Sequence, residues 1–322
     1  MRPAGYASSV FLDGRVRLHE RAGVEVRLRD LLRVEPPRVA KRAGRFIFHM
    51  GHACSTLLSR AIEALPGSLV LREPLVMRQL ARWEDARRPP PTYTADTWRR
   101  ADHLVQGLLA KTYAEGDLAV IKPSSLANGA MRTCLVERPS NRAVFLYRSL
   151  PSFLATMLRT RDNRQDGLAD LTVRLRARPG SVHASAVRAQ PIVRRLAALW
   201  MLHVQLFLEL LPLVPASRLL SLDADDFLSS PSATLAALGR AFGFSWSPSQ
   251  IALVGAGALF SRDAKRPSRS FDAGAHAFEL ARTRAALGDE IADAIAWCTR
   301  EMSARATEAL PRPLLGSGQG PC

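Results

Sequence analysis

The sequence is poor in cysteine and in lysine. Four cysteines in 322 residues, without Cys-x-x-Cys or Cys/His ligand spacing, predict neither a disulfide framework nor a zinc site, and a reducing cytoplasm is the expected compartment. Lysine accounts for only four of the 45 basic residues, so the net charge of +16 comes almost entirely from arginine. Because arginine is used so broadly, this charge does not by itself indicate a nucleic-acid-binding surface.

Long hydrophobic runs are also lacking. The first 23 residues never reach an apolar run of about seven residues before a charge intervenes, so no secretory signal is expected. The most apolar stretch, residues 196–215, contains His203, Glu209 and Pro212. These polar and helix-breaking residues favour a long buried helix over a membrane span.

What the chain does have is a regular alternation of short apolar runs and segments with helical spacing. The apolar runs are residues 45–50, 68–71, 118–122, 142–147 and 218–222. Strands buried on both faces that alternate with helices are typical of βαβ units around a mostly parallel sheet. The sequence therefore predicts an α/β fold, and 47% apolar residues suffice for a sizeable core.

The pattern also divides the chain into segments. Residues 9–33 alternate apolar and charged side chains, which predicts a small β-hairpin or meander in an extension that covers residues 1–40. Residues 41–310 are expected to form the main domain. Within it, the polar, arginine-rich residues 160–190 are expected to form a lid or substrate loop. The last residues, 311–322, are expected to be a disordered tail.

The most informative segment is FIFHMGHACSTLLSRAIEALPG, residues 46–67. A buried strand ends at Met50, and after a short turn Thr56 begins an apolar-periodic helix. Such a loop aims unpaired backbone N–H groups and the positive end of the helix dipole at one point, which suits a phosphate. No Gly-Lys pair follows Gly51, which argues against ordinary ATP or GTP chemistry. The alternative is an ordinary strand-to-helix turn in which Ser55 only caps the helix.

This segment resembles the 5′-phosphosulfate-binding loop of sulfotransferases that use 3′-phosphoadenosine 5′-phosphosulfate (PAPS), in the bacterial form G-H-x-G-S-T-L-L-S-R. The resemblance implies a three-layer P-loop NTPase-like fold and PAPS as the sulfonate donor. It assigns the donor's 5′ end to Gly51, His52, Ala53, Cys54, Ser55, Thr56 and Leu57. Cys54 departs from the family pattern, since it replaces a glycine, and its Cβ is expected to crowd the approach of the backbone to the phosphate.

A second match lies in RAVFLYRSLPSFLATMLR, residues 142–159. A predicted strand runs into Arg148, and Thr156 follows eight residues later, as in the family's R-x₇-[ST] pattern for the 3′-phosphate. A guanidinium forks onto phosphate oxygens while a helix hydroxyl contacts another side. Ser152 is the alternative hydroxyl. The simpler interpretation is an ordinary arginine followed by a helix-interior threonine.

The resemblance extends from about residue 44 to residue 305. Residues 219–244 resemble the family's strand and acidic turn, and residues 261–272 lie where the family has a basic loop over the nucleotide. Lys265 is the candidate contact in that loop, and Arg266 is a substitute.

The resemblance implies in-line, metal-independent transfer of a sulfonate to a hydroxyl or amine of a small molecule or carbohydrate. Glu73, at the end of the second predicted strand, is the favoured general base, unless it only pairs with an arginine. His52 is the second candidate base and the expected stabiliser of the leaving group, unless it only bonds a backbone carbonyl. Lys122 ends the third strand and is expected to contact the sulfonate or the acceptor, unless it is a solvated cation.

Other functions remain open at this stage. One is a P-loop kinase-like enzyme, which the missing Gly-Lys pair disfavours, and another is a catalytically inactive nucleotide- or polyanion-binding protein. Neither a metal nor a membrane is expected to take part, nucleic acid is not the first partner to test, and a homodimer is left open. No motif in this sequence identifies the acceptor.

Overall fold

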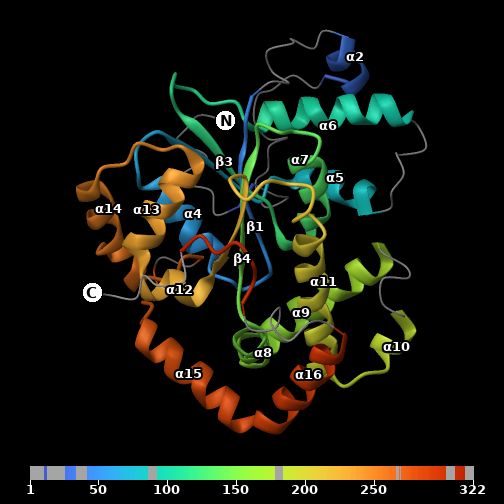
Figure 1. Cartoon of the computed structure of the whole chain (residues 1–322), viewed down its shortest axis with the longest axis vertical. Coiled ribbons are helices and arrows are strands. Elements are labelled where there is room, and N and C mark those ends of the chain that lie inside the picture. Colours follow the sequence, from blue (N-terminus) through green and yellow to red (C-terminus); the bar gives the residue numbers. More distant parts are fainter. Residues whose placement is uncertain are drawn as a thin grey trace.

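A five-stranded parallel sheet forms the centre of the molecule (Figure 1). The computed structural model describes residues 11–12, 26–33, 42–85, 93–177, 184–265, 268, 270–301 and 309–315. The strands are β1 (Arg45–His49), β2 (Ser68–Arg72), β3 (Leu118–Lys122), β4 (Arg142–Tyr147) and β5 (Leu219–Asp223). Their order is β2-β3-β1-β4-β5, and every neighbouring pair is parallel. The predicted α/β class, with a parallel central sheet flanked by helices, is confirmed, and each strand falls on one of the five apolar runs.

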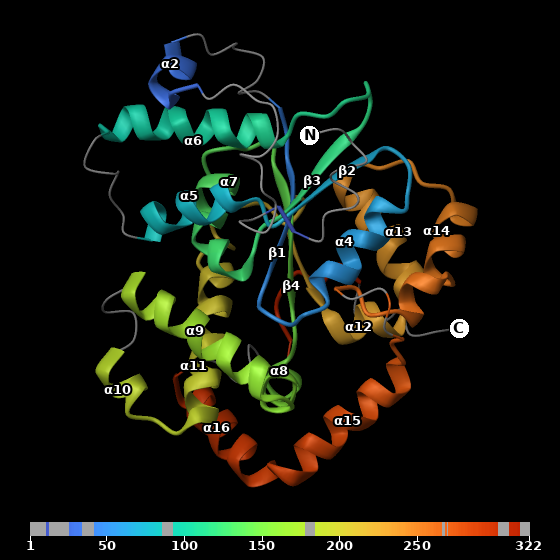
Figure 2. The ribbon, with the colours of Figure 1, turned by 180° about the vertical axis from the view of Figure 1, so that it is seen from behind.

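Helices cover both faces of the sheet, which explains why the strands read as continuous apolar runs (Figures 1 and 2). One face carries α4 (Ser55–Glu63), α12 (Ala224–Ser229), α13 (Pro231–Phe242) and α14 (Pro248–Gly255). The other carries α5 (Leu75–Asp85), α7 (Met131–Leu135), α9 (Arg161–Ala177) and α11 (Ile192–Leu208). The fully buried Trp200 of α11 donates its indole N–H to the carbonyl of Arg148, 2.8 Å away, and so anchors α11 beside the end of β4.

The two ends of the sheet carry different helices (Figures 1 and 2). At the carboxyl ends of the strands lie α8 (Leu150–Leu158), α15 (Ala273–Ala286) and α16 (Gly288–Glu301). At the opposite end lie α2 (Leu28–Arg33) and α6 (Ala95–Leu109). Shorter elements are η2 (Ser125–Ala130), α10 (Ala184–Arg188) and η3 (Ala258–Ser261). Among the residues placed in the structure, no helix is both long and apolar enough to cross a membrane.

The N-terminal segment differs from the expected β-hairpin where the structure describes it. Residues 28–33 form helix α2, because leucines at positions 28, 31 and 32 pack together on Trp98, Ala101 and Leu104 of α6. Most of residues 9–25 lie outside the described chain. The short piece 11–12 runs beside the end of β2, where the amide of Leu12 donates to the carbonyl of Arg72 at 2.6 Å.

Residues 160–190 also differ from the expected loop. Most of them form the 17-residue helix α9 and the short helix α10. Leu171 and Leu175 of α9 are buried, and so are the charged Asp170 and Arg174, which form an ion pair with each other. Buried paired charges explain why a core helix has the composition of a polar loop.

The expected tail begins with an ordered segment. The amide of Ser221 in β5 donates to the carbonyl of Arg312 at 2.8 Å, and the amide of Leu314 donates to the carbonyl of Ser221 at 2.7 Å. Residues 309–315 therefore run along the free edge of β5, and residues 316–322 lie outside the described chain.

Candidate functional site

The loop between β1 and α4 presents a row of unpaired hydrogen-bond donors. Within the described chain, none of the backbone amides of residues 51–57 donates a hydrogen bond, and the hydroxyls of Ser55 and Thr56 have no partner. The first turn of a helix leaves its N–H groups without acceptors, and here Cys54 offers no side-chain cap. The loop can therefore bind an anion at the positive end of the α4 dipole.

Three residues around this loop have left-handed backbone angles that side chains with a Cβ rarely adopt. They are His52, with φ of 60°, Cys54, with φ of 58°, and Glu73, with φ of 54°. Each such residue costs on the order of 1–3 kcal/mol, and such strain gathers at functional sites. Cys54 stands where the resembled loop has glycine, so the structure keeps the backbone shape that glycine would adopt without strain.

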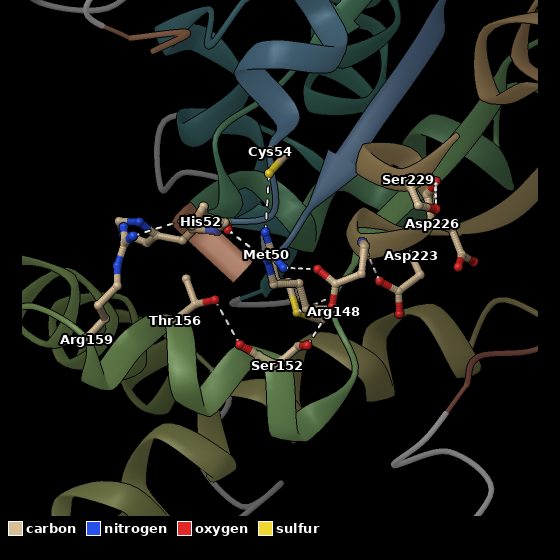
Figure 3. Close-up of polar contacts among 12 residues, drawn as sticks. Met50, His52, Cys54, Arg148, Ser152, Thr156, Arg159, Asp223, Asp226 and Ser229 are labelled. Carbon is tan, nitrogen blue, oxygen red and sulfur yellow. Dashed lines mark hydrogen bonds and ion pairs between the residues drawn. The ribbon is translucent and has the colours of Figure 1, made fainter. Parts of the chain in front are cut away.

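Arg148 joins the loop from the end of β4, as the sequence predicts (Figure 3). Its side chain is only 1% exposed, and its Nε donates to the carbonyl of His52 at 3.3 Å. Its Nη2 donates to the Sγ of Cys54 at 3.3 Å, and its Nη1 donates to Asp225. Burial raises the pKa of the Cys54 thiol, so the sulfur accepts this bond as a neutral group. All three guanidinium nitrogens of Arg148 therefore donate to acceptors within the protein.

The two candidate hydroxyls of α8 have different surroundings (Figure 3). The Oγ1 of Thr156 donates to the carbonyl of Ser152 within the same helix, at 2.8 Å. The Oγ of Ser152 instead donates to Asp225 Oδ2 at 2.5 Å, and Nη2 of Arg284 donates to the same Oγ. Ser152, the alternative in the sequence, is thus the hydroxyl that lies with Arg148, and Asp225 and Arg284 are site residues that the sequence did not single out.

Glu73 and Lys122 lie side by side because β2 and β3 are neighbours. Nζ of Lys122 is 2.5 Å from Oε1 of Glu73, whose Oε2 is 3.5 Å from Arg78. Lys122 is 1% exposed, and its Nζ lies over the face of the Phe11 ring, 5.1 Å from the ring centroid. The interpretation of Lys122 as a solvated cation is therefore wrong, and the main partner of Glu73 is this lysine.

The titration of this pair reflects its burial. Burial lowers the pKa of Lys122 to about 8, although the Glu73 carboxylate opposes this change. Burial acts to raise the pKa of Glu73, but the charge and hydrogen bond of Lys122 outweigh it and hold that pKa below its usual value. Both groups are therefore charged at neutral pH.

His52 faces α9, which the sequence did not predict as a helix. Its Nε2 is 3.3 Å from Oδ2 of Asp166. Burial, and next the charge of Lys265, lower the pKa of His52, so its imidazole is neutral at pH 7. Lys265 is exposed and close enough for its charge to act on the loop. Arg266 lies outside the described residues.

A buried polar network supports the site from behind. Asp170 of α9 accepts from the Oγ of Ser125 at 2.7 Å and lies 3.5 Å from Nε2 of His203 in α11. The amide nitrogen of Asn128 lies 2.9 Å from Nδ1 of His203 and donates to the carbonyl of His49 at 3.0 Å. The network ties α9, α11 and η2 to the end of β1, immediately before the loop.

This network makes the fold sensitive to acid. Burial lowers the pKa of His49 to about 3 and that of His203 to about 4, so both must gain a proton on unfolding below pH 6.5. Asp223 acts in the opposite direction, since burial raises its pKa to about 6. Burial also lowers the pKa of His276 in α15 to about 4, so three groups against one leave two net protons. The free energy of unfolding should therefore fall by about 2.7 kcal/mol per pH unit from pH 6 to pH 4. Urea denaturation at several pH values measures this slope, and an unchanged stability would mean that these imidazoles are charged in the folded chain.

In the part of the chain that the structure describes, one group of side chains has the spacing of metal ligands. It consists of Asp102, His103 and Glu137, from α6 and the segment after α7. None of these residues belongs to the loop or its neighbours, and metal-independent transfer stays a prediction.

Comparisons with known proteins add the following. No protein-family model and no curated protein matches the chain. Among solved structures, the sulfotransferase domain from the curacin biosynthetic pathway is 16% identical, with a TM-score of 0.44, and the match covers 77% of this chain and 98% of that domain. A sulfotransferase from Alicyclobacillus acidocaldarius is 15% identical, with a TM-score of 0.45 and coverage of 84% and 97%. The sulfotransferase domain of the Synechococcus PCC 7002 olefin synthase is 14% identical, with a TM-score of 0.39 and coverage of 79% and 97%. Likeness at this level does not identify the activity of this chain.

Proposed function

We propose that this protein is a sulfotransferase that moves a sulfonate from PAPS to a hydroxyl or amine of a small-molecule or carbohydrate acceptor. The observation that carries the proposal is the loop of residues 51–57, in which the backbone amides and two hydroxyls have no acceptor within the described chain. The loop leads from the central strand β1 into α4 without the Gly-Lys pair of nucleoside triphosphatases. An anion site of this kind at the carboxyl edge of a parallel sheet suits a nucleotide phosphate.

The residues present fit both ends of the donor. The 5′-phosphosulfate would bind at the start of α4, where Ser55 and Thr56 add hydroxyl donors to the amides. The 3′-phosphate would bind beside Arg148 and Ser152, which lie one strand further along the same edge. Arginine matches phosphate oxygens through paired N–H groups, and Lys265 adds a positive charge at the surface.

PAPS would supply an activated sulfonate whose transfer leaves negative charge on the 5′-phosphate. The protein's task is to hold the two oxygens in line and to stabilise that charge. The amides of residues 51–57 do so without reorganisation. A neutral His52 gives its one ring N–H to Asp166, so its imidazole can donate to the leaving group only after it gains a second proton.

Two side chains can take the proton of the acceptor. Glu73 is charged and lies at the end of β2. Lys122 pairs with one of its oxygens and Arg78 with the other, so one of these two contacts must open before Glu73 can take a proton. His52 is neutral, and Asp166 holds its Nε2, so the other ring nitrogen would take the proton. We favour Glu73, because it follows β2 and lies outside the loop of residues 51–57. His52 belongs to that loop.

A thermal-shift measurement tests the donor. Adenosine 3′,5′-bisphosphate at about 100 times its Kd should stabilise the fold by about 2.7 kcal/mol and raise Tm by several degrees, whereas ATP with Mg²⁺ should have little effect. The variant Thr56→Val should lose much of the shift. Thr299→Val is the matched control, because that hydroxyl donates to the Ile295 carbonyl within α16.

The result also separates the competing functions. Stabilisation by ATP with Mg²⁺ alone would overturn the proposal in favour of a kinase-like enzyme. The absence of a response to either nucleotide would instead favour a catalytically inactive binding protein.

A further inference from the structure

Building on the proposed function, we propose that Arg284 of α15 binds the 3′-phosphate of the donor. In the protein without donor, the carboxylate of Asp225 occupies the site of this phosphate, and the donor displaces it. The sequence predicts this site from Arg148, a hydroxyl of α8 and the basic loop of residues 261–272. Arg284 and Asp225 are not among these predicted contacts. The inference concerns how the chain distinguishes a nucleotide with a 3′-phosphate from one with a 3′-hydroxyl.

The contacts of Asp225 are those that a phosphate would make. One of its carboxylate oxygens accepts from Nη1 of Arg148, and the other accepts from the Oγ of Ser152 at 2.5 Å. Arg148 and Ser152 are almost fully buried, so packing fixes the positions of their donors. Asp225 is the accessible member, since its side chain is 44% exposed.

The surroundings of Asp225 favour its displacement. It belongs to an acidic turn that also carries Asp223 and Asp226, and like charges so close to one another repel. Burial raises the pKa of Asp223 to about 6, and the negative charges of Asp225 and Asp226 add to this effect. Because two neighbouring carboxylates repel Asp225, a more highly charged anion can displace it at a lower free-energy cost than it could displace an isolated carboxylate.

Arg284 lies on the solvent side of the same position. It projects from α15, which packs along α8, and its Nη2 donates to the Ser152 Oγ. Arg148 approaches from the buried side, so the two guanidinium groups flank the place where Asp225 and Ser152 meet. A phosphate with a charge near −2 gains more from a second arginine than a carboxylate with a charge of −1 does. α15 therefore closes the phosphate site that β4 and α8 begin.

The test compares adenosine 3′,5′-bisphosphate with adenosine 5′-monophosphate by titration calorimetry. Arg284→Ala should weaken binding of the bisphosphate by about 10- to 100-fold and change binding of the monophosphate by less than about threefold. Arg282→Ala is the matched control, because Arg282 projects from the same helix, is 69% exposed and pairs only at the surface with Glu279, and it should change neither affinity. Asp225→Asn removes the competing charge and should tighten binding of the bisphosphate alone.

The outcomes separate this inference from the proposed function. If the unaltered chain prefers the bisphosphate and Arg284→Ala keeps that preference, the role of Arg284 is overturned and the sulfotransferase proposal stands. If Asp225→Asn weakens binding of the bisphosphate, Asp225 supports the site rather than holding the phosphate's place. A chain that binds the bisphosphate no more tightly than the monophosphate would overturn both proposals. Unfolding midpoints of each variant confirm that the comparison is made on folded protein.

Discussion

Replacing Glu73 with glutamine should lower the free energy of unfolding by about 3 kcal/mol, because it leaves a buried ammonium without its counter-charge. Lys122 is 1% exposed, and its ion-pair partner in the structure is Glu73 at 2.5 Å. The ammonium can escape only by losing its proton. In the unfolded chain the lysine has its ordinary pKa of about 10.4, so a folded chain with a neutral Lys122 is at most about 5 kcal/mol less stable at pH 7 for this reason, which sets the upper limit of the effect. Urea denaturation at pH 7 measures the loss, which should shrink at pH 9.

The double variant Glu73→Gln/Lys122→Met isolates the ion pair. A buried pair replaced by apolar or neutral groups of similar volume is often no less stable than the original, so this chain should come within about 1 kcal/mol of the unaltered protein. Glu279→Gln, at an exposed pair with Arg282, is the control and should cost less than about 0.5 kcal/mol. A double variant as unstable as the single one would place the cost in the lost ion pair between Glu73 and Arg78, rather than in the unpaired Lys122.

The fold could be predicted where local pattern and tertiary environment agree. The five strands are buried on both faces, so their apolar runs are visible in the sequence. Helix α9 could not be predicted, because its buried Asp170 and Arg174 make it read as a polar loop. Their burial depends on partners such as Ser125 and His203, which are far away in the sequence. A helix whose core face includes paired charges has no local signature.

The candidate site divides in the same way. Residues at strand ends, such as Arg148, Lys122 and Glu73, could be predicted, because parallel strands bring their carboxyl ends to one edge. Their pairing could not, since the contact between Glu73 and Lys122 follows from β2 lying next to β3. Arg284 gave no signal, because it is one of many arginines and its position depends on how α15 packs on α8.

Glu73→Gln should also reduce kcat by about 10²- to 10⁴-fold, the usual contribution of a general base, while the Kd of adenosine 3′,5′-bisphosphate changes little. The amide keeps the shape of the carboxylate but cannot accept a proton at neutral pH. Turnover is measured as bisphosphate released from PAPS in the presence of hydroxyl and amine acceptors, with the best acceptor of the unaltered chain used for every variant. Asp166→Asn serves as the comparison for His52 as the base.

The same double variant decides whether Glu73 acts in chemistry or only in structure. Glu73→Gln/Lys122→Met should regain stability without regaining turnover, because removing the buried cation repairs the packing but supplies no proton acceptor. If turnover returns together with stability, the role of Glu73 is to neutralise Lys122. If Glu73→Gln keeps normal turnover while Asp166→Asn loses it, the base is His52, since Asp166 orients its imidazole. His52 belongs to the loop of residues 51–57. As the base, it would take the proton from the acceptor's hydroxyl or amine next to the backbone amides that bind the leaving phosphate.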